Sequence, residues 1–367
     1  MRIMISSEAL HKGVTKVKQA TPSSSMNDKD EIMIQTEEDG IFIRRQGSQS
    51  YAEFFLYCSV TEQGTIVAKA ESFKFLEHAV GDKVFYLDKK TLRTNDDDSI
   101  LTISSGEWDY FAKKRPETEF YPVEPIVNKT LWSVDPTDLV VGHLYFSGSY
   151  FATTDRSNFS VVHLTKPLPF KAIFPVGAIS TFRDQKEEYM MTVEDNMVWF
   201  KKGGFVVGSA MTAEAKKMPL HFDTISQATT EGFPFFEINK DELSRLISQI
   251  VTHATSSALI SQKRASCRIS VELKEDGIVF FESNWSQLGQ IKRTLKPVKH
   301  SDTLKVSIVG QHIAAALPQL DGETVKFYMI SMMGQTWPCL IEGNNKFVLA
   351  QTDFSWTYQN EPPRSEE

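Results

Sequence analysis

The chain has 367 residues, of which 41% are hydrophobic and 24% charged, and its formal net charge is −7. This length predicts two or three domains, and the composition is that of a globular protein and excludes a disordered one. No run of about eighteen apolar residues occurs, so no membrane-spanning segment is predicted. The negative charge argues against a protein that holds nucleic acid by charge alone. The exception is a protein that encloses nucleic acid, in which a basic lining coexists with an acidic exterior.

The cysteines and the first residues bear on the compartment. Cys58, Cys267 and Cys339 are odd in number and widely separated, which favours a reducing compartment and argues against disulfides and against a zinc site. Residues 1–8 lack the apolar stretch and the cleavage site of a secretory signal. We therefore expect a cytoplasmic protein.

The first part of the chain predicts a helix followed by strands. Leu10, Val14 and Val17 share one face of a helix near the beginning. The next elements are a hairpin with glycine at its turn at 39–43, a strand that enters a helix at 65–76, and a strand at 83–87. Glycine at a hairpin turn permits the positive φ that β-branched neighbours resist.

The same elements return in the middle of the chain. Residues 123–134 predict a helix that Pro125 and the following Pro136 keep short or distorted. After it come a hairpin turn at 147–151, a strand that enters a helix at 172–183, and a strand at 189–193.

A third copy follows. Its first helix has one apolar face, formed by Leu243, Leu246, Ile247, Ile250 and Val251. Asn239 is the predicted N-cap, with Glu242 as its capping-box partner. Then come a hairpin at 276–280, a strand and helix at 307–317, and a strand at 325–329. A unit repeated three times predicts an α+β fold of three similar domains, each with two helices packed on antiparallel sheets.

The domain boundaries follow from these copies. We place the domains at residues 1–121, 122–233 and 234–353, with a polar tail at 354–367.

No catalytic motif is found. Nucleophile-elbow, phosphate-loop and paired-histidine patterns are all missing from the sequence, so we predict neither an enzyme nor a bound cofactor or metal. The acidic run at 95–98 is interpreted as a turn between strands at 92–94 and 100–103; the alternative is the metal site of a nuclease.

Three segments resemble the bacterial DNA polymerase III beta subunit, the sliding clamp family. Residues 152–161 resemble that family's Ala-Thr-Asp-Gly-His-Arg-Leu-Ala stretch, with Thr154 and Asp155 kept and residues 156–158 replaced. Residues 316–323 resemble its leucine-rich helix and acidic turn, and residues 337–349 its last two strands. The chain departs from the family's Met-Pro-Met-Arg-Leu ending, which fits a phage or mobile-element version.

The resemblance implies a ring-forming clamp and a function. Two copies would close head to tail around double-stranded DNA and tether DNA polymerase, with a clamp-loader ATPase to open the ring. The helices would line the hole, and the residues expected to face DNA are Lys12, Lys16, Lys74, Arg183, Lys240 and Arg245. The alternative for these side chains is a solvated helix face.

The resemblance also implies two protein-binding regions. A cleft for a partner peptide with leucine and phenylalanine would be lined by Val140, Thr154, Phe159, Ile225, Leu349, Ala350 and Gln351, with Phe159 partly exposed; ordinary core packing is the alternative. The dimer interface would use an edge strand at 107–112 with Tyr110 and Ala112, together with Leu259 and Ile260. Another class of function, a β-rich structural protein of a phage particle, also fits a repeated β-rich chain.

Overall fold

The computed structural model describes residues 1–21, 30–78, 82–88, 91–94, 100–102, 115–134, 142–182, 187–212, 222–261, 267–274, 277–282, 291–301, 304–332 and 335–349. The chain forms two compact units, residues 1–125 with 168–216 and residues 126–167 with 217–367. Their limits differ from the domain boundaries placed near residues 122 and 234, which stay a prediction.

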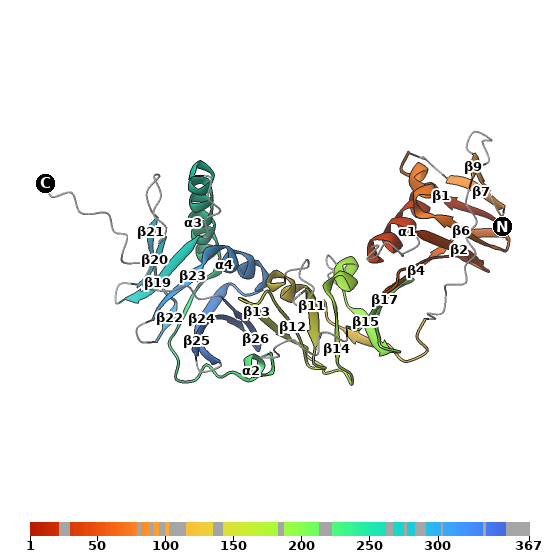
Figure 1. Ribbon diagram of the computed structural model, residues 1–367. Coiled ribbons are helices and arrows are strands. Elements are labelled where there is room, and N and C mark those ends of the chain that lie inside the picture. Colours follow the sequence, from red (N-terminus) through yellow and green to blue (C-terminus); the bar gives the residue numbers. More distant parts are fainter. Residues whose placement is uncertain are drawn as a thin grey trace. The chain divides into compact units, whose positions relative to one another are not determined.

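The described elements follow a similar order three times, although the second set has one strand fewer before its second helix and ends in an additional short helix (Figure 1). The first set is β1 (Arg2–Ser6), α1 (Ser7–Ala20), β2 (Glu31–Glu37), β3 (Gly40–Gln46), β4 (Ser50–Tyr57), β5 (Ser59–Glu62), β6 (Thr65–Lys69), the 3-10 helix η1 (Ala70–His78), β7 (Asp82–Asp88), β8 (Thr91–Thr94) and β9 (Ile100–Thr102). The second is β10 (Tyr121–Val123), η2 (Val127–Ser133), β11 (His143–Phe146), β12 (Tyr150–Thr154), β13 (Phe159–His163), β14 (Ala172–Pro175), η3 (Val176–Phe182), β15 (Tyr189–Glu194), β16 (Met197–Lys202), β17 (Phe205–Ala210) and a short α2 (Phe222–Gln227). The third is β18 (Phe235–Asn239), α3 (Lys240–Ser261), β19 (Arg268–Lys274), β20 (Gly277–Glu282), β21 (Lys292–Leu295), β22 (Lys299–His300), β23 (Lys305–Val309), α4 (Gly310–Ala316), η5 (Leu317–Gln319), β24 (Thr324–Met332), β25 (Gln335–Glu342) and β26 (Asn345–Val348). The predicted α+β class and the predicted strand-to-helix segments are confirmed.

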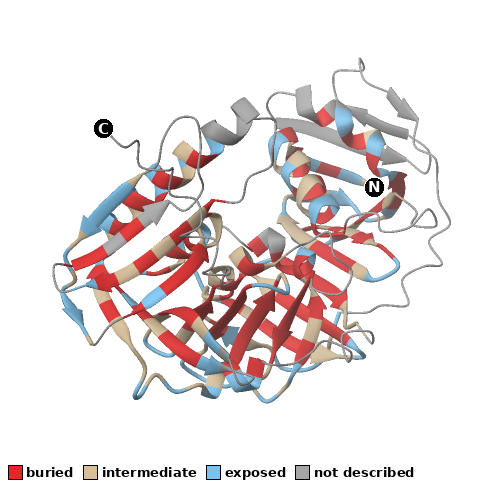
Figure 2. Cartoon of the chain, turned by 60° about the vertical axis from the view of Figure 1, so that its left-hand side comes forward, coloured by how far each residue is buried: buried red, intermediate tan, exposed pale blue. Residues whose placement is uncertain are grey.

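The first unit packs α1 against a long antiparallel sheet. The sheet has the strand order β10-β15-β16-β17-β4-β3-β2-β6, and a second sheet has the order β5-β1-β7-β8-β9. The predicted stripe of Leu10, Val14 and Val17 is buried, and buried and exposed residues both occur along α1 (Figure 2). Gly13 permits this packing, because a Cβ there would lie 2.6 Å from Cδ1 of Ile43.

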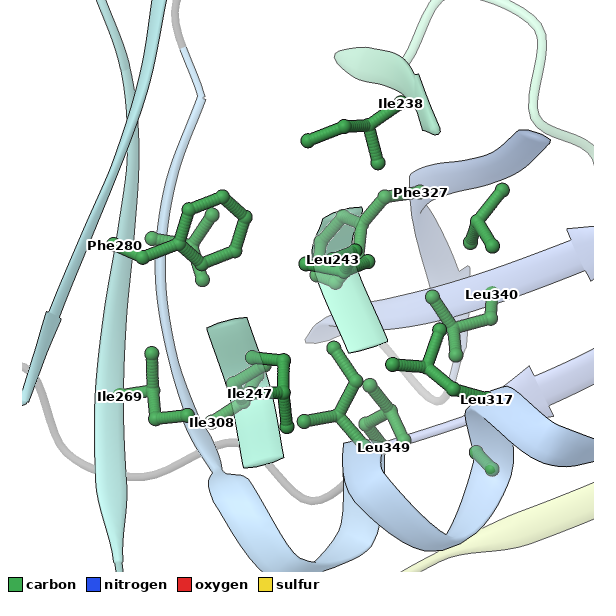
Figure 3. Close-up of a cluster of buried hydrophobic side chains, with 14 of the residues drawn as sticks. Ile238, Leu243, Ile247, Ile269, Phe280, Ile308, Leu317, Phe327, Leu340 and Leu349 are labelled. Atoms are coloured by element: carbon green, nitrogen blue, oxygen red, sulfur yellow. The ribbon is translucent and has the colours of Figure 1, made fainter. Parts of the chain in front are cut away.

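The core of the second unit is built from two sheets together with the helices α3 and α4. One sheet contains the strands β11-β12-β13-β26-β25-β24-β18-β22 in this order, and the other is β21-β20-β19-β23. Ile247 of α3, Leu317 of η5, Phe327 and Leu340 meet in this core (Figure 3). The apolar face predicted for α3 is confirmed: four of its side chains are buried and Val251 packs partly buried beside them.

The helix ends follow their local sequence. The Oδ1 of Asn239 accepts a hydrogen bond of 3.0 Å from the backbone N–H of Glu242, which confirms the predicted N-cap of α3. The predicted helix after Pro125 is the seven-residue 3-10 helix η2, short as expected. It starts after the proline because the residue before a proline avoids helical backbone angles.

The hairpin glycines differ from one another. Gly148 and Gly277 adopt φ of 99° and 138°, as the turn argument predicts. Gly40 does not have a positive φ; a Cβ there would lie 2.1 Å from the carbonyl oxygen of Leu56, so the close approach of β4 is what favours glycine. Among the described residues, no helix has the length and hydropathy to cross a membrane.

Candidate functional site

A group of lysines lies on the first unit beside α1. Lys12 is exposed and Lys16 half-buried, and the Nζ of Lys16 lies 4.7 Å from the ring centroid of Phe54. Burial lowers the pKa of Lys16, and so do the charges of Lys12 and Lys202. The positive charges of Lys12 and Lys16 favour an anion such as a phosphate, whereas the ammonium of Lys202 also pairs with a carboxylate oxygen of Glu187 at 2.9 Å. Sequence reasoning missed Lys202, because it lies on β16, far from α1 in the sequence.

The other residues predicted to face DNA differ in whether their charged groups already contact other groups of the protein. Arg245 is exposed on α3, and its Nε donates to the carbonyl oxygen of Asp241 at 3.3 Å. Lys74 is exposed and lies 3.7 Å from a carboxylate oxygen of Glu71, an exposed pair that contributes little to stability. The Nζ of Lys240 donates to the carbonyl oxygen of Leu320 at 2.5 Å, so its ammonium is engaged within the fold. Arg183 lies outside the described residues.

Two of the predicted cleft residues share one face of the second unit's sheet, and a third lies in the helix that packs there. Thr154 of β12 pairs with Phe159 of β13, which pairs with Val348 of β26. Directly paired residues of antiparallel strands project to the same face, so these three side chains lie together. Ile225 belongs to α2, which packs against β13 and β26, and it is buried. Val348 was not predicted, because strand register decides its place.

Leu349 does not belong to this group. It follows Val348, and adjacent strand residues point to opposite faces. Its side chain is buried in the core with Leu317 and Ile247 (Figure 3). The prediction that Leu349 lines the same cleft as Phe159 is therefore wrong, and core packing, the alternative reading, holds for it. Val140, Ala350 and Gln351 lie outside the described residues.

The sequence predicts that Phe159 is partly exposed, but the structure shows that it is buried. Its side chain is 7% exposed, because it begins β13 and is paired on both sides. The ring of Phe222 of α2 stands edge-on to it, with 6.3 Å between the ring centroids. The expectation failed because α2 was not foreseen on this face.

The turn before Phe159 is built by the Thr-Asp pair. The Oδ1 of Asp155 accepts from the backbone N–H groups of Ser157 at 2.9 Å and Asn158 at 2.7 Å, and the Oγ1 of Thr154 accepts from the N–H of Arg156 at 2.9 Å. Arg156 has a φ of 79°, a conformation in which glycine is the least strained residue. The hydrogen bonds of the turn hold Arg156 there and leave its side chain and that of Ser157 exposed.

Most of the predicted interface residues and the acidic run lie outside the part of the chain that the structure describes. Tyr110 and Ala112 lie outside the described residues, as does the acidic run at 95–98. Leu259 and Ile260 belong to the last turns of α3, but their side chains are not described. The strands on either side of the acidic run, β8 and β9, pair antiparallel, in agreement with the turn interpretation. Among the described residues no three His, Cys, Asp or Glu side chains group as metal ligands would.

Comparisons with known proteins divide into sequence and structure. No protein-family model matches the sequence, and no curated protein matches it. The structure resembles the DNA polymerase sliding clamp from Bacillus subtilis, at 14% identity, with a TM-score of 0.78 over 96% of this chain and 99% of that chain.

Two further clamps give the same result. The beta chain of DNA polymerase III from Streptococcus pneumoniae is 13% identical, with a TM-score of 0.75 over 96% of this chain and 99% of that one. The beta subunit of DNA polymerase III from Pseudomonas aeruginosa is 13% identical, with a TM-score of 0.76 over 96% and 100%. The chain therefore has the fold of the DNA polymerase III beta subunit, the DNA polymerase sliding clamp, in a widely diverged sequence.

Proposed function

We propose that this chain is a DNA sliding clamp, a processivity factor with no catalytic site of its own. The observation that carries the proposal is the likeness to sliding clamps over 96% of this chain and 99% of the Bacillus subtilis clamp. The lysines beside α1 support it, because they supply positive charge in a chain whose net charge is −7. Such a distribution suits a protein that encloses DNA.

The proposed assembly is a ring of two copies. Each copy contributes three domains, residues 1–121, 122–233 and 234–353, and the repeated element order supports this division. A head-to-tail contact through Tyr110, Ala112, Leu259 and Ile260 closes the ring in this proposal. A closed ring cannot thread a circular duplex unaided, so a clamp-loader ATPase is the expected partner, and the clamp works with DNA in the cytoplasm.

The proposed clamp acts by staying topologically linked to DNA and catalyses no reaction. Its contacts with DNA are to phosphates and carry no sequence information, so they stay loose enough for sliding. A polymerase bound to the ring remains near the primer end after it lets go, and its high effective concentration makes rebinding faster than escape. The polymerase contacts the clamp on the face that carries Thr154, Phe159 and Ile225, two of them on neighbouring strands and the third on the helix packed against them.

Retention on circular DNA tests the proposal. The chain is loaded onto nicked circular duplex, washed at high salt, and released by cutting the circle. Salt removes a binder held by charge, because bound phosphates regain their counterions, whereas a topological link survives. We expect retention until linearisation; loss from intact circles at the rate seen on linear DNA would refute the clamp.

The mass of the assembly provides an independent check. Light scattering should give about twice the chain's 41.6 kDa, as a closed dimer requires. A trimer or hexamer would favour the phage structural protein, which the structural comparisons do not support.

A further inference from the structure

Strand β4 of the first unit presents different side chains on its two faces. Phe54 and Leu56 point toward α1, because a Cβ on Gly13 would lie 3.1 Å from Cδ1 of Phe54 and 3.0 Å from Cδ1 of Leu56. Adjacent residues of a strand project to opposite faces, so Phe55 and Tyr57 lie on the face that α1 does not cover. Helix α1 and these two aromatic side chains therefore belong to opposite sides of one sheet.

Three aromatic rings form a stripe on this second face. Phe42 of β3 lies directly opposite Phe55, with 4.8 Å between their ring centroids, and Tyr57 stands edge-on to Phe55 at 5.0 Å. We call Phe42, Phe55 and Tyr57 the aromatic stripe. Phe55 is half-buried, whereas Tyr57 is 82% exposed, so the stripe opens toward solvent at the Tyr57 end.

Packing on the sheet explains only part of the stripe. A Cβ on Gly40 would lie 2.9 Å from Cζ of Phe55, and one on Gly204 would lie 3.2 Å from its Cβ. The side chain of Phe55 thus occupies the space beside two glycines. Tyr57 leaves most of its surface in water, so packing gives no reason for a large aromatic side chain there. Contiguous exposed apolar surface is typical of interaction sites.

The turn beside Tyr57 is acidic. It consists of the last residue of β2 and the two residues that join it to β3, and we call it the acidic turn: Glu37, Glu38 and Asp39. Glu37 pairs with Gly40, and Gly40 pairs with Tyr57, so the carboxylate and the ring stand on one face with a glycine between them. All three acidic side chains are exposed, and among the described residues none has an ion-pair partner. Three uncompensated negative charges therefore lie at the open end of the aromatic stripe.

The same face already holds one guanidinium with a ring and a carboxylate. The guanidinium of Arg44 lies 4.6 Å from the ring centroid of Phe42, and its Nε donates to a carboxylate oxygen of Glu53 at 2.7 Å. An aromatic face and a carboxylate both attract a guanidinium. At the other end of the stripe, Tyr57 and the acidic turn present the same two kinds of group, and none of the described cations lies over Tyr57.

We infer that the aromatic stripe and the acidic turn bind an arginine-bearing segment of a partner protein, with a guanidinium on the ring of Tyr57 and beside the carboxylates of the turn. Charge selects this partner, because the acidic turn repels the phosphates of nucleic acid and a second copy of the chain, whose net charge is −7. Arginine is favoured over lysine, because a planar guanidinium can stack on a ring and donate to two carboxylate oxygens at once. The inference goes beyond the proposed clamp function and does not depend on it, since it concerns one face of the first unit.

A short arginine peptide tests the inference on the full-length chain. The probe is the amidated pentapeptide Ser-Arg-Leu-Arg-Ser with fluorescein at its N-terminus, titrated by fluorescence anisotropy at low salt. We expect saturable binding that Tyr57→Ser weakens about fivefold, which corresponds to a lost cation–π contact of about 1 kcal/mol. Tyr57→Phe keeps the ring and should keep the affinity. The triple variant Glu37→Gln, Glu38→Gln, Asp39→Asn should weaken binding about tenfold.

Matched variants and peptides separate a specific contact from general attraction between opposite charges. The control variant neutralises three other exposed carboxylates of the first unit, Glu8→Gln, Glu71→Gln and Glu188→Gln. It changes the net charge by the same amount and should leave the affinity unchanged. The peptide Ser-Lys-Leu-Lys-Ser should bind more weakly than the arginine peptide, and Ser-Glu-Leu-Glu-Ser should not bind.

Three results would overturn the inference: no saturable binding to the wild type, wild-type affinity in Tyr57→Ser, or equal weakening in the two triple variants. Light scattering of the acidic-turn variant tests the other occupant, because a smaller assembly would assign this surface to a second copy of the chain. Melting temperatures should match that of the wild type, since the substituted side chains are exposed. Retention on circular DNA, measured with the same variants, should be unaltered, so failure of the clamp and failure of the arginine site are distinguishable.

Discussion

The carboxylate of Glu53 is buried, and its hydrogen-bond and ion-pair partners offset the free energy that burial of a charge costs. It is 3% exposed, and one carboxylate oxygen accepts from Nε of Arg44 at 2.7 Å and from the hydroxyl of Tyr51 at 2.9 Å. Arg115 lies 3.7 Å from the other oxygen. Burial raises the pKa of Tyr51 and the charge of Glu53 raises it further, so this hydroxyl stays protonated and keeps donating. An ionised carboxylate buried at this position without partners would strongly destabilise the fold.

Removing that charge should destabilise the first unit. Glu53→Gln removes the counter-charge of the half-buried Arg44, so we expect the free energy of unfolding to fall by about 2 to 3 kcal/mol, measured by urea denaturation. Glu187→Gln is the control, because Glu187 is 81% exposed where it pairs with Lys202 and should change stability by less than about 0.5 kcal/mol. Equal effects of the two substitutions would show that the buried ion pair contributes no more to stability than the exposed one.

A histidine on the face under α2 should make the second unit sensitive to acid. Burial lowers the pKa of His163, and the charge of Lys346 lowers it further. The unfolded chain, with a pKa of about 6.5, therefore binds the proton more readily than the folded protein. Stability is present above that pH and is lost as the pH falls below it toward the folded pKa.

The measurement is the melting temperature between about pH 8 and about pH 5. His163→Gln, which can still bond the hydroxyl of Ser226, should flatten the decline. Some decline should remain, because burial also lowers the pKa of His312, against the opposing charge of Asp155. A pH profile identical to that of the wild type would exclude His163 as a contributor.

Among the elements, α1 shows how a basic helix can lie tightly on a sheet. Gly13 faces Ile43, Phe54 and Leu56 with no room for a side chain, and this closeness brings Lys16 over the ring of Phe54. The last turn is held by Arg45, whose guanidinium donates to the carbonyl oxygen of Lys18 at 3.2 Å and to the hydroxyl of Thr21 at 2.9 Å. The lysines of α1 are thereby presented from a rigid base.

Adding one methyl group at Gly13 should disturb that base. In Gly13→Ala the new Cβ would meet Cδ1 of Ile43 at 2.6 Å, and we expect a loss of about 1 to 3 kcal/mol together with weaker loading onto DNA. Gly177→Ala serves as the comparison, because a Cβ there meets nothing within 4 Å. A Gly13→Ala protein as stable as Gly177→Ala would mean that α1 can shift away from the sheet at no cost.

On the scale of the whole molecule, the net charge of −7 and the basic group near α1 have to be reconciled. The affinity of a protein that binds DNA by charge alone would fall with each phosphate contact that is removed. In the proposed ring, closure of the dimer would hold the protein on DNA, so its basic residues would affect loading and sliding and the dimer contact would decide retention.

Replacement of the two α1 lysines separates these possibilities. For Lys12→Ala with Lys16→Ala we expect slower loading or faster sliding, seen by single-molecule tracking, with retention on closed circles like that of the wild type. The matched control is Lys326→Ala, an exposed lysine of β24, which should alter neither. Release of the α1 double variant from circles as fast as from linear DNA would mean that charge, and not topology, holds the protein.

The sequence by itself determined the repeated order of strands and helices, the apolar faces of α1 and α3, and the Asn239 cap, because periodicity and capping are local properties. It also placed Thr154 and Phe159 near each other through the short turn between them. Only the tertiary structure decided that Lys202 joins Lys16, that Lys240 is engaged by Leu320, and that Leu349 faces the core instead of the partner face. Each of these depends on strand register or on contacts between distant segments, and a shift of one residue in a strand reverses the face that a side chain occupies. The docking of α2 on Phe159 belongs to the same class, because a six-residue helix takes its place from the surface that receives it and not from its own sequence.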